Sequence, residues 1–333
     1  MPDAGLRHGD VVEVKSAAEI LATLDDGGAL EGLPFMPELV QYCGHRFVVD
    51  KRANKVCDTV HYTGSRRLPD AVLLVDLRCD GSGHEGCQAE CRPFWKEAWL
   101  RRVESATAQP PPPDEQATAA LLQLTRRNTT RTDCSEGKTK VHYRCQATDL
   151  PGASEHLKLW DPRPYFRECQ NGNVPVGRFL RVMTRAAVQE PLRKLGLVPE
   201  VHLPGTRTAE KKPEPTLDLQ PGERVQVKSK EEIAATLNAQ GRNRGLWFDR
   251  EMLPYCGGIF EVRRRISRFI DDRSGKMIDL KSEAVTLQGV VCSGDLSLRR
   301  WFCPRAIYPF WRESWLRRVD PAVKPAGPRP PAT

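Results

Sequence analysis

Hydrophobic and polar residues alternate at the start of two stretches of the chain that resemble each other. In the first stretch Val11, Val12 and Val14 stand among polar residues, and residues 222–229 repeat the pattern. Alternation of this kind predicts a short strand with one buried face. The sequence therefore predicts the same first strand in two places.

A helix is expected directly after each of these strands. Ser16 is followed three positions later by a glutamate, and Ser229 is followed by a glutamate at the same spacing. This is the capping-box arrangement, in which the serine oxygen accepts an amide proton and the glutamate reaches back to the backbone. We expect helices over residues 17–24 and 231–237.

Three further strands of the first stretch follow from its apolar pattern. They are expected within residues 44–56, over residues 72–78 and over residues 98–103, with Trp95 and Trp99 facing inward. The opening Gly-Asp-x-Val strand, the central hairpin and the closing Trp-Leu-Arg-Arg-Val strand resemble a bacterial SH3-like small barrel. The resemblance implies a mainly β fold with some α, in which two homologous SH3-like small barrels flank an α+β middle domain.

The repeat and the proline-rich segments divide the chain of 333 residues. A constant shift of 213 positions superposes the two opening strands, since residue 9 falls on residue 222. Runs rich in proline predict extended linkers and a disordered tail. The expected segments are a first repeat over 9–103, a linker over 104–118, a middle α+β domain over 119–200, a linker over 204–221, a second repeat over 222–319 and a tail over 320–333.

The composition is that of a globular protein, with 39% hydrophobic and 28% charged residues. No apolar run is long enough for a membrane span or a secretory signal, so we expect a cytoplasmic protein without membrane contact. Thiols stay reduced in that compartment. The eleven cysteines therefore favour metal ligands, catalysis or plain burial over disulfides.

Three cysteines occupy matching places in the two repeats. Thiolates bind Zn²⁺ tetrahedrally, and four of them close a structural site whereas three leave one position open. In the first repeat His84 and Cys91 lie close to the matching cysteines in the sequence, so four ligands and a complete site are expected there. The candidate ligands of the first repeat are Cys43, Cys79, His84, Cys87 and Cys91.

The second repeat offers only the three matching thiols, Cys256, Cys292 and Cys303. A carboxylate such as Asp295, a water molecule or a group from the middle domain would complete a zinc site there. An iron–sulfur cluster uses the same thiolates and is the alternative cofactor in either repeat. Reduced cysteine also behaves as a small hydrophobe, so core packing is the alternative without a metal.

The middle domain and the second repeat hold further candidates. A second metal or thiol site would use Cys134, His142, Cys145 and Cys169, although isolated thiols are often structural. The second repeat carries 19 basic and 12 acidic residues, which allows binding of nucleic acid or another polyanion. The arginines for that role are Arg263, Arg264, Arg265 and Arg268, and the stacking residues are Trp247, Phe248, Phe260 and Trp301. A solvated basic face is the alternative explanation.

The sequence leaves open whether the protein is an enzyme, because it lacks the common phosphate-loop, nucleophile-elbow and zinc-protease motifs. The leading hypothesis is a zinc-binding, cysteine-rich tandem-repeat scaffold for a protein partner. The alternative is a thiolate-ligated metalloenzyme or accessory protein of a biosynthetic pathway, with Asp295 or Glu313 as base. Glu97 and Glu313 are expected instead to bind backbone amides.

Overall fold

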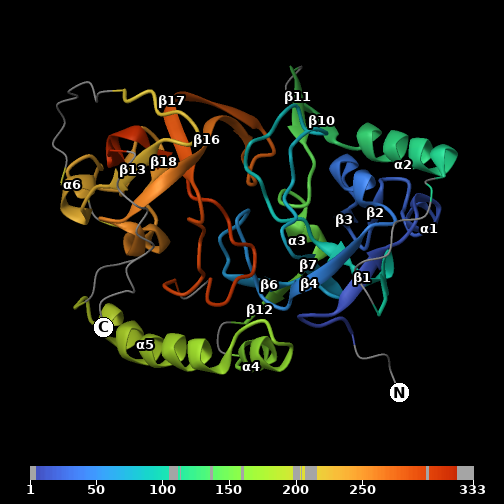
Figure 1. The fold of residues 1–333 in the computed structure, drawn as a ribbon, viewed down its shortest axis with the longest axis horizontal. Coiled ribbons are helices and arrows are strands. Elements are labelled where there is room, and N and C mark those ends of the chain that lie inside the picture. The colour runs from blue at the N-terminus through green and yellow to red at the C-terminus, as the bar shows by residue number, and fades with distance from the viewer. Residues whose placement is uncertain are drawn as a thin grey trace. The chain divides into compact units, whose positions relative to one another are not determined.

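The structure of the protein is a computed structural model, shown in Figure 1. It describes residues 5–104, 112, 114–135, 138–158, 161–197, 203, 205–206, 216–297 and 300–320. Most of the predicted linkers and nearly all of the predicted tail lie outside the described residues. The chain divides into two compact units. Unit 1 comprises Met1–Leu180, Phe269–Ile278 and Phe302–Arg305, and unit 2 comprises Arg181–Arg268, Asp279–Trp301 and Ala306–Thr333.

Unit 1 is built on a five-stranded antiparallel sheet in the order β8-β7-β4-β1-β9. Its strands are β8 (Trp95–Lys96), β7 (Ala71–Leu74), β4 (Arg46–Arg52), β1 (Val11–Val14) and β9 (Leu100–Arg102). The other elements of the first repeat are α1 (Ala17–Leu21), β2 (Ala29–Leu30), β3 (Leu33–Pro34), the 3₁₀ helices η1 (Pro37–Tyr42) and η2 (Glu97–Trp99), β5 (Val56–Cys57) and β6 (Ser65–Arg67).

The second repeat has the corresponding sheet order, β18-β17-β16-β13-β19. Its elements are β13 (Arg224–Val227), α6 (Lys230–Ala234), β14 (Arg242–Asn243), β15 (Leu246–Trp247), η3 (Arg250–Tyr255), β16 (Ile259–Ile270), β17 (Met277–Leu287), β18 (Trp311–Arg312), η4 (Glu313–Trp315) and β19 (Leu316–Arg318). The distal ends of β16 and β17 and the turn between them belong to unit 1.

The prediction of a mainly β fold with some α agrees with the structure. The SH3-like barrel is not confirmed, because no sheet closes in the part of the chain that the structure describes. In unit 1 the edge strands β8 and β9 flank the sheet at opposite ends. Strand alternation predicts one buried face, but it does not specify whether the two edges meet.

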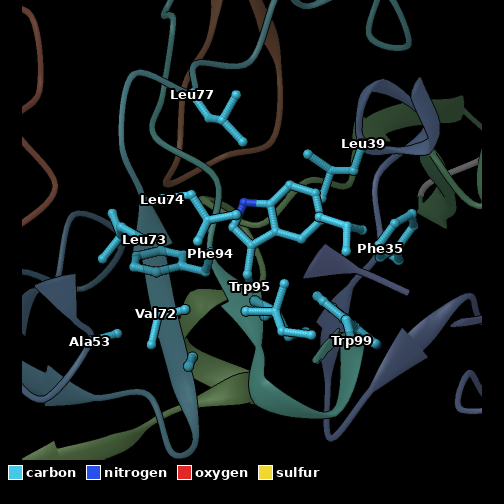
Figure 2. Close-up of a cluster of buried hydrophobic side chains, with 14 of the residues drawn as sticks. Phe35, Leu39, Ala53, Val72, Leu73, Leu74, Leu77, Phe94, Trp95 and Trp99 are labelled. Atoms are coloured by element: carbon cyan, nitrogen blue, oxygen red, sulfur yellow. The ribbon is translucent and has the colours of Figure 1, made fainter. Parts of the chain in front are cut away.

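The core of the first repeat gathers around its two predicted inward tryptophans (Figure 2). Trp95 and Trp99 have no exposed surface, and the ring of Phe35 lies edge-on to Trp99 at 5.0 Å between centroids. The indole N–H of Trp99 donates to Thr23 Oγ1 at 3.1 Å, which satisfies its one polar atom inside the core.

The middle segment joins the first repeat through a shared sheet, because β12 (Glu155–Leu157) pairs with β6. The other elements of the middle segment are α2 (Glu115–Arg127), β10 (Thr130–Ser135), β11 (Lys138–Tyr143), α3 (Leu150–Ala153), α4 (Arg163–Gln170) and α5 (Val176–Lys194). The sequence predicts a basic amphipathic helix over residues 178–195 that is broken near Pro191, but α5 continues through this proline. Pro191 removes one N–H donor from the last turn of the helix.

Candidate metal centre

Four cysteines line one cavity of about 40 Å³ in unit 1. Cys79, Cys87 and Cys91 come from the first repeat, and Cys145 comes from the middle segment. Ile270 and Arg305 line the same cavity from segments of the second repeat that belong to unit 1. Residues distant in sequence therefore meet at one point.

The first three cysteines lie on residues 75–94, which separate β7 from β8 and contain no helix or strand. The Cys79 N–H donates to the Cys91 carbonyl at 2.8 Å, so the two ends of the cysteine segment are held side by side. Gly81 has a φ of +72°, and a Cβ there would lie 2.0 Å from the Cys87 carbonyl oxygen. The segment folds back on itself at a position that only glycine can occupy.

Burial dominates the acid–base behaviour of these thiols. It raises the pKa of Cys145 to about 12, and it also raises the pKa values of Cys79, Cys87 and Cys91. Charge repulsion adds to this effect at Cys79, first from Glu38, whose Oε1 lies 3.7 Å from the sulfur, and then from Cys91 and Cys145. Without a nearby cation the thiols stay protonated, and a bound metal would favour the thiolates.

Backbone amides near the thiols act on their pKa values. The amides of Gly81, Ala89 and Ala147 each follow a cavity cysteine by two positions and act to lower its thiol pKa, against the larger effect of burial. The Ile270 N–H also donates to Cys87 Sγ at 3.4 Å. Such N–H···S bonds stabilise thiolate ligands.

His84 lines the cavity, but both of its ring nitrogens face oxygen atoms. Nδ1 lies 2.6 Å from Oε1 of the buried Glu38, and Nε2 lies 3.0 Å from the Arg144 carbonyl. Burial lowers the pKa of His84, while the hydrogen bond to Glu38 and its charge raise the pKa to a net value above the ordinary one. Both ring nitrogens therefore face oxygen acceptors in this arrangement.

A second thiol pair lies in the same unit beside two buried cations. Cys57 N–H donates to Cys303 Sγ at 3.2 Å, and Arg305 donates to the Cys57 carbonyl at 3.3 Å. Arg305 also contacts Asp272 at 3.4 Å. Burial lowers the pKa of Lys55 to about 8, although the charges of Cys303, Glu168 and Cys57 oppose the shift. Cys303 thus belongs to unit 1, whereas Cys256 and Cys292 belong to unit 2.

Cys43 and Cys256, the matching pair of predicted ligands, lie at the C-terminal ends of η1 and η3. Each packs against the hydrophobic core of its own repeat. Burial raises the pKa of both thiols to about 11. Cys43 is not among the residues that line the cavity, so its surroundings are those of a core residue.

The remaining groups of the second repeat make structural contacts. The Cys292 N–H donates to the Ile307 carbonyl at 2.8 Å, as Cys79 does to Cys91 in the first repeat. The Asp295 N–H donates to Ser293 Oγ at 3.2 Å. Glu313 accepts the amide of Leu217 at 2.7 Å, and Glu97 accepts that of Leu6 at 3.2 Å. Both glutamates agree with the predicted binding of backbone amides.

The four candidates of the middle segment are not gathered in one place by the described contacts. Cys145 lines the cavity, while His142 Nδ1 contacts the Ser274 carbonyl at 2.7 Å. Cys169 is half-buried on α4, and burial raises its thiol pKa. The side chain of Cys134 lies outside the described residues.

Three of the four predicted polyanion-binding arginines contact other residues of unit 2. Arg263 lies over the Tyr308 ring at 4.9 Å, Arg265 pairs with Asp218 at 2.5 Å, and Arg268 pairs with Asp279 at 2.9 Å. Arg264 also has an interaction partner. Arginines on a solvated basic face make contacts of this kind, and no bound polyanion is needed to explain them.

Among the residues described by the structure, no group of three or more His, Cys, Asp or Glu side chains is arranged to hold a single metal ion. Comparisons with protein-family models, curated proteins and solved structures find no match for this chain. No helix within the described ranges is long and apolar enough to cross a bilayer.

Five residues near these thiols belong to no recognisable motif, and the sequence analysis did not identify them as candidates. They are Glu38, Lys55, Cys57, Asp272 and Arg305. One signal was present, because Glu38 and Glu251 occupy matching positions at the shift of 213 residues. Glu251 accepts the amides of Leu296 and Ser297, while Glu38 accepts the amide of Gly83. A buried carboxylate thus organises the loop after Cys79 or Cys292 in each repeat.

Proposed function

We propose that the protein is a metal-binding interaction protein, in which a thiolate metal centre fastens the middle segment to the first repeat. The ligands are Cys79, Cys87, Cys91 and Cys145. One observation carries the proposal: these four cysteines, from two separate parts of the sequence, line a single cavity in unit 1. The partner protein is an expectation from the sequence.

The length of the cysteine-bearing loop supports a stabilising metal. Residues 75–94 form no regular structure, and loops of that length are uncommon in compact domains unless they are functional or otherwise tied down. A metal bound to three loop thiols and to Cys145 would fix the loop against the middle segment. The burial of the thiols favours this stabilising role over a reactive one.

Metal analysis of the purified full chain tests the proposal. We expect tightly bound metal in the wild type, and loss of that metal in Cys79→Ser and in Cys145→Ser. Cys43→Ser and Cys169→Ser serve as matched controls and should retain the metal, because neither residue lines the cavity. Metal-free wild-type protein, or equal loss in all four variants, would rule the proposal out.

A further inference from the structure

The kind of metal centre follows from how the four thiols surround their cavity. Resting on the proposed function, we infer that the cavity of Cys79, Cys87, Cys91 and Cys145 holds an iron–sulfur cluster and not a single zinc ion. Thiolate ligands are common to both centres, and the space between the ligands distinguishes them.

A single zinc ion requires convergent ligands. With Zn–S bonds of about 2.3 Å, the sulfurs of a tetrahedral site lie roughly 3.8 Å apart. In the described part of the chain no three potential ligands are arranged in this way. The cavity that the four cysteines line together with other residues measures about 40 Å³, whereas one water needs about 10–15 Å³ on the same measure. The space suits a group of several atoms.

One buried cation, Arg305, lines the cavity, and one buried carboxylate, Glu38, lies 3.7 Å from Cys79 Sγ. An iron–sulfur core with four thiolates carries net negative charge, which an apolar interior disfavours unless a cation lies near. Arg305 is 4% exposed, lines the cavity and interacts with the charge of Cys91. Asp272 lies 3.4 Å from the guanidinium, and its charge raises the pKa of the Cys91 thiol by more than the charge of Arg305 lowers it.

Hydrogen bonds to sulfur complete the environment. The Ile270 N–H donates to Cys87 Sγ at 3.4 Å. Amide bonds to the sulfurs and low exposure are the means by which proteins stabilise such clusters and set their reduction potential. Cys145 supplies the fourth bond that the three loop cysteines lack.

Assembly consumes iron and inorganic sulfide from outside the chain. Each of the four thiols releases its proton to water as its sulfur bonds an iron atom, so four S–H bonds are replaced by four Fe–S bonds. The ferrous and ferric iron of the core comes with the supplied components, and no residue of the chain is oxidised or reduced.

Anaerobic isolation of the full chain, followed by reconstitution with iron and sulfide, tests the inference. We expect iron and acid-labile sulfide in equal amounts, a broad visible absorption and a paramagnetic signal after reduction by dithionite. Cys79→Ser and Cys145→Ser should lose the absorption, and Cys43→Ser should keep it. Stoichiometric zinc without labile sulfide would overturn the cluster and leave the proposed function intact, while absence of any metal would overturn both.

The role of Arg305 has its own readout. Arg305→Gln removes the buried positive charge, so we expect the cluster potential to shift to a more negative value. Arg305→Lys should restore the potential toward that of the wild type, and Arg317→Gln, an exposed arginine of unit 2, should leave it unchanged. An intact cluster with an unchanged potential in Arg305→Gln would exclude Arg305 as the compensating charge.

Discussion

Glu168 on α4 is a carboxyl group with no exposed surface. Its Oε2 accepts a hydrogen bond from Asn173 Nδ2 at 2.8 Å. Burial raises the pKa of Glu168 to about 7, and the charge of Lys55 opposes that shift. A neutral carboxyl group is favoured inside unit 1, so the residue couples folding to pH.

The sign of this coupling gives a first prediction at the residue scale. The folded state binds the Glu168 proton more tightly than the unfolded state, whose pKa is near 4.5. The stabilising contribution is therefore complete below about pH 4.5 and is lost as pH rises through about 7. Glu168→Gln stays neutral, so the variant should gain ~3 kcal/mol of unfolding free energy relative to the wild type between pH 4.5 and pH 8.

Urea denaturation of both proteins across that pH range measures the difference. Glu115→Gln, which changes an exposed glutamate on α2, is the matched control and should follow the wild type at every pH. Parallel pH profiles for Glu168→Gln and the wild type would contradict the burial argument.

Residues of the candidate site differ in how far the sequence could predict them. Cys79, Cys87 and Cys91 stand close together in the chain and predict a shared site. Cys145 and Arg305 reach the same cavity only through tertiary structure, for which local spacing carries no information. Cys43 and Cys256 match in the two repeats, and both lie at the C-terminal end of a 3₁₀ helix against the core of their own repeat.

Capping boxes are elements that the sequence specifies well. Ser16 and Ser229 both cap their helices as predicted, because each arrangement depends on residues only three positions apart. The helices α1 and α6 are nevertheless shorter than predicted and end at Leu21 and Ala234. Their length depends on packing against the sheet, which a local pattern does not describe.

Removal of one cap gives a prediction at the element scale. Ser229→Ala leaves the Glu232 amide without its side-chain acceptor and should lower the unfolding free energy by about 1 kcal/mol. Ser229→Asp keeps an acceptor at the same place and should retain most of the stability. Urea titration measures both variants, and equal losses in the alanine and aspartate variants would refute the capping explanation.

At the scale of the whole molecule, the repeat in the sequence and the compact units in the structure have different boundaries. Unit 1 includes Phe269–Ile278 and Phe302–Arg305, which lie in the second repeat by sequence. Similarity at a constant shift reveals that a segment is duplicated, but it does not reveal which residues of each copy pack together. Both inserted segments supply residues at the cavity, Ile270 and Arg305.

This composition of unit 1 predicts how a truncated chain should behave. A fragment of residues 1–206 retains all four cavity cysteines but lacks Ile270, Asp272 and Arg305. The cavity loses the Ile270 amide that donates to Cys87 and two of its lining residues, Ile270 and Arg305, so the environment of the four thiols is incomplete. We expect the fragment to retain less than half of the metal bound by the full chain, as measured by elemental analysis after gel filtration. Full occupancy in the fragment would mean that the first repeat and the middle segment suffice for binding, and that the segments from the second repeat have no part in the centre.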